Sequence, residues 1–146
     1  MDGVVSLNPP LMLALIAMSS AQLFKFIVAW IWYGRADFRR LVGTGGMPSA
    51  HSASVTALTI AVGLEAGWGS TLFGATAFFS LVIMYDATGI RRAAGRQAQI
   101  LNRMLDELKD YHKLEPVRLK ELLGHTPLEV LLGAAYGFLI AVLLHS

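Results

Sequence analysis

The apolar positions of the chain fall into four long runs, which predict helices over residues 11–33, 48–64, 71–86 and 127–144. The first run is broken only by Gln22 and Lys25 and is long enough to cross the roughly 30 Å hydrocarbon layer of a bilayer. At a rise of about 1.5 Å per residue, the second and third predicted helices are barely long enough to cross this layer. The Ser, Thr and Gly residues of the second favour packing against other helices over contact with lipid. We predict an all-α membrane bundle of about four transmembrane helices, forming a single domain over residues 1–146.

A fifth pattern differs in kind. Between residues 96 and 112 the apolar positions recur at intervals of three and four residues, with charged residues between them. This spacing predicts an amphipathic helix over about 96–112, which Pro116 is expected to end or kink. Two placements are open: the helix lies in the membrane interface or caps the bundle, or it is solvated and packs on the neighbouring loops.

Composition agrees with a membrane protein. Of the 146 residues, 55% are hydrophobic and 15% charged, and the mean hydropathy of +0.55 is too high for an ordinary soluble domain. The chain has no cysteine, which excludes disulfides, thiolate nucleophiles and iron–sulfur clusters. The first apolar run lacks a preceding basic region and is too long for a signal peptide, so we expect it to be retained.

The basic residues are distributed unevenly. Eleven of the twelve Lys and Arg residues fall in two connections, 34–47 and the long segment between the third and fourth apolar runs. Four crossings place these two connections on the same side of the membrane, which the positive-inside rule assigns to the cytoplasm.

The first candidate motif is the glycine-rich turn of residues 43–47, which leads through Pro48 into the second predicted helix. With Pro48 at the first helical position, backbone N–H groups and the positive end of the helix dipole could hold a phosphate. Ser49 could donate its hydroxyl to the phosphate, and His51 would lie one turn further on. The alternative is an ordinary loop with His51 as a packing residue.

The second motif opens the last helix. Thr126 as N-cap, Pro127 at the first position and Glu129 at the third form a capping box, which gives Glu129 a structural role. His125 directly precedes the cap, where its imidazole can reach a ligand and an acidic neighbour can orient its ring. Glu129 could serve as that neighbour or only as a cap.

Further charged residues lie near the same membrane boundary. Asp86 ends the third predicted helix, and Lys25 lies two turns before the end of the first. Asp86 is either a supporting residue of the site or the partner of a nearby arginine. Lys25 either extends to the interface or points inward toward an anion. The arginines that follow Asp86 either attract lipid headgroups or bind phosphate, and they are Arg91, Arg92 and Arg96.

Topology joins these motifs. In a four-crossing bundle the second and fourth helices begin at the face where the first and third end. His51, His125, Asp86 and Lys25 then share one membrane level, and an anion is their simplest common ligand. Two histidines can supply a nucleophile and a general acid for phosphoryl transfer, so we expect no metal and no cofactor.

Both histidine motifs resemble those of the type 2 phosphatidic acid phosphatase superfamily. The whole chain is similar to its divergent bacterial and plastid branch, related to acid phosphatases and vanadium-dependent haloperoxidases, most clearly over 45–51, 85–97 and 119–130. This resemblance implies that His125 is the nucleophile, His51 the general acid and Glu129 the orienting carboxylate. The same resemblance implies that Ser49 and Gly46 contact the phosphate. It also implies a bacterial inner membrane or a plastid membrane as the location.

The chain departs from the superfamily pattern at several positions. Ala50 replaces a glycine and Glu129 an aspartate, and Leu119 stands where an arginine is expected six residues before the nucleophile. Lys25 could be the lysine of the first motif, but 32–33 is Trp-Tyr in place of an arginine–proline pair.

Three functions follow from these residues. The first is a metal-independent phosphatase or phosphotransferase acting on a lipid-linked or membrane-proximal phosphate. The second is a non-catalytic binder or transporter of an anionic lipid or phosphate. A metal-dependent alcohol phosphotransferase is disfavoured, because no second acidic residue lies near Asp86 in the sequence. We expect no nucleic-acid partner, and four short helices leave room for a second copy of the chain to complete a lipid site.

Overall fold

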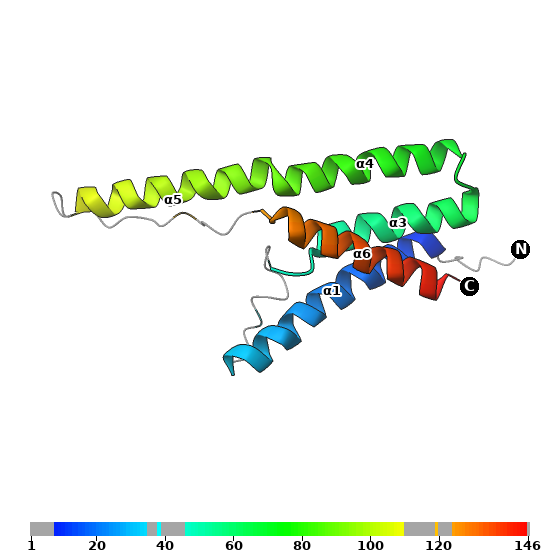
Figure 1. Cartoon of the computed structure of the whole chain (residues 1–146), viewed down its shortest axis with the longest axis horizontal. Coiled ribbons are helices and arrows are strands. Elements are labelled where there is room, and N and C mark those ends of the chain that lie inside the picture. Colours follow the sequence, from blue (N-terminus) through cyan, green and yellow to red (C-terminus); the bar gives the residue numbers. More distant parts are fainter. Residues whose placement is uncertain (1–7, 35–37, 39–45, 110–118, 120–123, 146) are drawn as a thin grey trace, which may run out of the picture.

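The described residues fold into helices joined by short turns. The structure, a computed structural model, describes residues 8–34, 38, 46–109, 119 and 124–145. Their helices are α1 (Pro9–Tyr33), α3 (Ala50–Ala66), α4 (Thr71–Thr88), α5 (Ile90–Lys109) and α6 (Pro127–Leu144) (Figure 1). The described residues contain no strand, and the predicted all-α membrane fold is confirmed.

Helix α3 forms the centre of the bundle. It packs against α1 on one side, α6 on another and α4 on a third, and its turn into α4 spans only residues 67–70 (Figure 1). Alternate helices therefore run in opposite directions. The end of α1, the start of α3, the end of α4 and the start of α6 lie at one end of the bundle, as the sequence predicted.

Small side chains fill the interior. The central cluster contains only alanines, with Ile60, Tyr136 and Ile140 packed partly against it. Large apolar side chains point outward instead; Phe79 is 63% and Leu131 66% exposed. Small residues let helix backbones approach closely, while bulky apolar residues suit contact with lipid. The cluster consists of Ala17, Ala21, Ala50, Ala53, Ala57 and Ala141.

Two glycines of α6 allow its close approach to α3. A methyl group added at Gly133 would overlap the backbone of Ser49, and one added at Gly137 would overlap the carbonyl of Ala53. Glycine is therefore required at both positions, four residues apart on one helix face. This contact holds the starts of α3 and α6 together.

Three of the described helices are long and apolar enough to cross a membrane: α1, the apolar part of the α4–α5 stretch, and α6. Helix α3 has 17 residues, at the lower limit for a crossing. Because α3 packs between the other three helices, it lies at their membrane level. Thr59 of α3 and Ser80 of α4 share a hydrogen bond of 2.7 Å, which satisfies both hydroxyls inside the bundle.

Some predicted boundaries were wrong. Helix α3 begins at Ala50 rather than at Pro48, because Ser49 acts as its N-cap and accepts a hydrogen bond from the backbone N–H of Ser52. Helix α4 continues beyond Asp86 to Thr88. Helix α5 begins at Ile90, six residues before the predicted start of the amphipathic helix.

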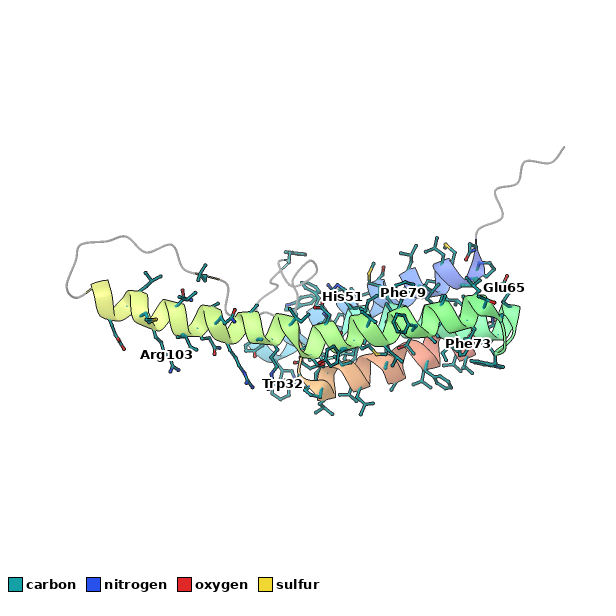
Figure 2. The ribbon with its side chains drawn as sticks, turned by 90° about the horizontal axis from the view of Figure 1, so that it is seen from above. Trp32, His51, Glu65, Phe73, Phe79 and Arg103 are labelled. Atoms are coloured by element: carbon teal, nitrogen blue, oxygen red, sulfur yellow. The ribbon has the colours of Figure 1, made fainter. Side chains whose placement is uncertain are left out.

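The early start of α5 makes it nearly continuous with α4. The Gly89 N–H donates to the Tyr85 carbonyl and the Ala93 N–H to the Gly89 carbonyl, so helical hydrogen bonding passes through the single residue between the two helices. The segment 90–95, expected to be part of a loop, is therefore helical. Both views show α5 continuing the direction of α4 beyond the bundle (Figure 1, Figure 2). Figure 2 shows Arg103 on the projecting part.

Candidate active site

His125 and Glu129 form the centre of the candidate site. The imidazole Nδ1 of His125 lies 3.2 Å from Glu129 Oε2, and the histidine side chain is only 5% exposed. The same oxygen accepts a 2.9 Å hydrogen bond from the Thr126 backbone N–H, while Thr126 Oγ1 accepts one from the Glu129 N–H. Glu129 therefore caps helix α6 and contacts the histidine ring at the same time, whereas the sequence left open whether it does both or only caps the helix.

Backbone hydrogen bonds attach this motif to two other helices. The His125 N–H donates to the Ala87 carbonyl near the end of α4, at 2.9 Å. The Ser49 N–H donates to the Glu129 carbonyl, at 3.1 Å, and joins the start of α3 to the start of α6. Three helix ends thus meet around His125.

Ser49 is fully buried beneath this junction. Its Oγ accepts hydrogen bonds from the backbone N–H of Ser52, at 3.4 Å, and from the Ser52 hydroxyl, at 3.1 Å. These bonds fix the first turn of α3, which carries His51. The contact of Ser49 with phosphate that the sequence suggested stays a prediction.

His51 lies opposite His125. The two ring centroids are 6.5 Å apart and the ring planes meet at 59°. His51 is exposed whereas His125 is buried, so the pair has one open and one enclosed side. Figure 2 shows His51 toward the end of the bundle opposite Glu65, on the side from which α5 extends.

Lys25 points inward from α1. Lys25 is only 9% exposed. A methyl group built on Gly46 would lie 3.6 Å from Lys25 Cδ, so the glycine backbone packs along the lysine stem. Of the two placements considered for Lys25, the structure has the inward one.

The remaining predicted residues lie on helices α4 and α5. Asp86 is half-buried on α4, Arg92 is half-buried on α5, and Arg96 is exposed one turn further along α5. The side chain of Arg91 lies outside the described residues. So do residues 43–45 of the glycine-rich turn, 110–112 at the predicted end of the amphipathic helix, and Pro116.

Sequence reasoning missed the residues that assemble the site. Ala87 contributes only its carbonyl, for which the sequence carries no signal. Gly133 and Gly137 did carry one, because two glycines four residues apart in an apolar helix indicate a close helix contact. Among the described residues, no three His, Asp or Glu side chains gather as ligands for a metal ion.

The apolar helical bundle and the two neighbouring histidines are together typical of an integral membrane protein with a polar site at one end. The family model described as "Divergent PAP2 family" matches residues 6–140. The chain is also 43% identical to YuiD, described as an uncharacterized membrane protein, of Bacillus subtilis (strain 168), and the match covers 94% of each chain. No solved structure matches the chain. The chain belongs to the divergent PAP2 family, which confirms the resemblance seen in the sequence.

Proposed function

We propose that the protein is a metal-independent phosphatase or phosphotransferase that acts on a lipid-linked or membrane-proximal phosphate. The observation that carries the proposal is the setting of His125, whose Nδ1 contacts Glu129 and whose ring centroid lies 6.5 Å from that of His51. A carboxylate at Nδ1 favours the tautomer in which Nδ1 carries the proton, which leaves a lone pair on Nε2. That nitrogen is then available as a nucleophile.

The proposed reaction has two steps. His125 Nε2 attacks phosphorus, the bond from phosphorus to the leaving oxygen breaks, and protonated His51 gives its proton to that oxygen. Water then attacks the phosphohistidine, and His51 takes a proton from it, so inorganic phosphate leaves and both histidines return to their first state. A separation of 6.5 Å between ring centroids is compatible with one phosphoryl group between them, since nucleophile and acid each act at about 3 Å.

Negative charge on the phosphate would be balanced from several directions. Lys25 brings an ammonium group into the bundle, and the starts of α3 and α6 carry the positive ends of their helix dipoles. Arg91, Arg92 and Arg96 lie on the adjoining α5, at the position where a headgroup would approach from the membrane boundary. Asp86 would support this group of arginines.

A direct test uses purified wild-type protein in liposomes that contain phosphatidic acid. We expect inorganic phosphate to be released, and the rate to be unchanged by a chelator, because both catalytic groups are side chains of the protein. Inert protein that still binds orthovanadate, a phosphate analogue, would instead establish a non-catalytic phosphate binder. An absolute requirement for magnesium would contradict the metal-independent mechanism.

We also infer that the site-bearing end of the bundle faces the cytoplasm, because the two connections at this end, residues 34–47 and the stretch between α4 and α6, hold eleven of the twelve Lys and Arg residues. The chain has no cysteine, so single cysteines report their own location. In intact bacterial cells, Gly69→Cys in the α3–α4 turn should react with a membrane-impermeant maleimide. Gln99→Cys on α5 should react only after permeabilisation. The opposite pattern would place the site outside.

A further inference from the structure

Asn102 is a buried amide on a helix that otherwise projects from the bundle. Its side chain is 4% exposed, and a buried carboxamide is stable only when its donor and acceptor are both satisfied. Both find their partner in one residue: Nδ2 donates to the Leu119 carbonyl, at 2.9 Å, and Oδ1 accepts from the Leu119 N–H, at 3.0 Å. The side chain thus fixes both the position and the orientation of the backbone at Leu119.

Leu119 is connected to the candidate nucleophile by a short piece of chain. It stands six positions before His125, whose own N–H donates to the Ala87 carbonyl. Ala87 and Asn102 both belong to the nearly continuous α4–α5 rod. The chain leading to His125 is therefore attached to the same rod at both ends.

The span from Leu119 to His125 covers six peptide units, which reach at most about 20 to 22 Å. Because Asn102 fixes the backbone of Leu119 on α5, it also limits how far from this point the backbone of His125 can lie.

We propose that Asn102 is a positioning residue for His125. It acts through the backbone of Leu119 and does not touch the reacting groups. The kinetic part of this inference rests on the proposed function, whereas its geometric part does not.

The geometric part is tested by measuring a distance between two spin labels. Leu119→Cys and Phe79→Cys introduce labels at exposed positions of the cysteine-free chain, and the Leu119 substitution leaves the backbone atoms that bond to Asn102 in place. We expect one narrow distance distribution in this background. Adding Asn102→Ala should broaden it, while Gln99→Ala, which removes an exposed amide from the same helix, should not.

Asn102→Asp is the second variant. Its carboxylate can accept from the Leu119 N–H but cannot donate to the Leu119 carbonyl, so the broadening should be smaller than with alanine. If Asn102→Ala does not fold, the distance distribution of Asn102→Asp is compared with that of the background instead. A distribution that stays as narrow in both variants as in the Gln99→Ala control would overturn the proposal.

The kinetic part uses phosphate release from phosphatidic acid liposomes. Asn102→Ala should lower kcat by about 10- to 100-fold, the usual cost of losing a residue that orients a functional side chain, with KM changed by less than about twofold. A change confined to KM would contradict positioning. Wild-type protein without phosphatase activity would refute the proposed function, and the label distances would still decide whether Asn102 holds the chain.

Discussion

His125→Ala is expected to reduce phosphate release from phosphatidic acid liposomes at least about a thousandfold, to the background rate. The substitution removes the nitrogen that attacks phosphorus in the proposed reaction and leaves a methyl group in its place. The backbone N–H of residue 125 can still bond to Ala87, so the fold should remain. The measurement is the initial rate of phosphate release together with the thermal unfolding midpoint in detergent.

His145→Ala is the matched control for this substitution. His145 follows α6 at the opposite end, is exposed, and contributes its backbone N–H to the Ala141 carbonyl. Its loss should leave the rate within about twofold of wild type. Equal rates for wild type, His125→Ala and His145→Ala would rule out a role for His125 as nucleophile.

Glu129→Gln separates the two roles of this residue. Glutamine can still accept from the Thr126 N–H and cap α6, but it lacks the charge that stabilises a protonated imidazole. We therefore expect an unfolding midpoint close to that of wild type and a rate about 10- to 100-fold lower. An unchanged rate would reduce Glu129 to a capping residue.

Gly137→Ala is expected to destabilise the bundle by about 1 to 3 kcal/mol or more, the range for overpacking a tight contact. The added methyl group would overlap the carbonyl of Ala53, a backbone atom that cannot turn aside as a flexible side chain can. Helices α3 and α6 would have to separate, which also disturbs the junction around His125. Both the free energy of unfolding in detergent and the rate of phosphate release should fall.

Gly74→Ala provides the control for the same chemical change. Gly74 lies inside α4, and a methyl group there would meet no described atom within 4 Å. Because alanine is the better helix former, stability should stay equal or rise by up to about 1 kcal/mol. If Gly137→Ala is as stable as Gly74→Ala, the close contact between α3 and α6 is not what holds the bundle together.

The sequence predicted the helices well because apolar runs of this length have few alternatives in a bilayer. It placed α6 at its observed bounds and α1 within two residues of its start. The start of α5 was missed, because Gly89 and the arginines after it are typical of a loop. The structure shows that a single glycine did not interrupt the helical hydrogen bonds around it.

The candidate site divides in the same way. Thr126, Pro127 and Glu129 lie close together in the chain, so their capping box could be predicted from local spacing. A contact between His125 and Glu129 could be anticipated, but the sequence could not decide whether Glu129 makes this contact or only caps the helix. The bonds that place these residues, from His125 to Ala87 and from Asn102 to Leu119, use backbone atoms of residues distant in sequence. Backbone atoms are the same at every position, so nothing in the sequence marks them.

In this bundle the buried side chains are mostly small and the exposed ones are often large, which is the reverse of the usual pattern in soluble proteins. Among the described residues, the largest side chains that are fully enclosed are the serines at positions 49 and 52, while many large apolar side chains, such as Phe79 and Leu131, are exposed. Where α6 meets α3, the main chain of one helix touches the main chain of the other. The contact between these helices therefore depends on the absence of a Cβ atom at Gly133 and Gly137. The smallest residues thus determine how the helices pack, and the large apolar residues form the surface that suits contact with lipid.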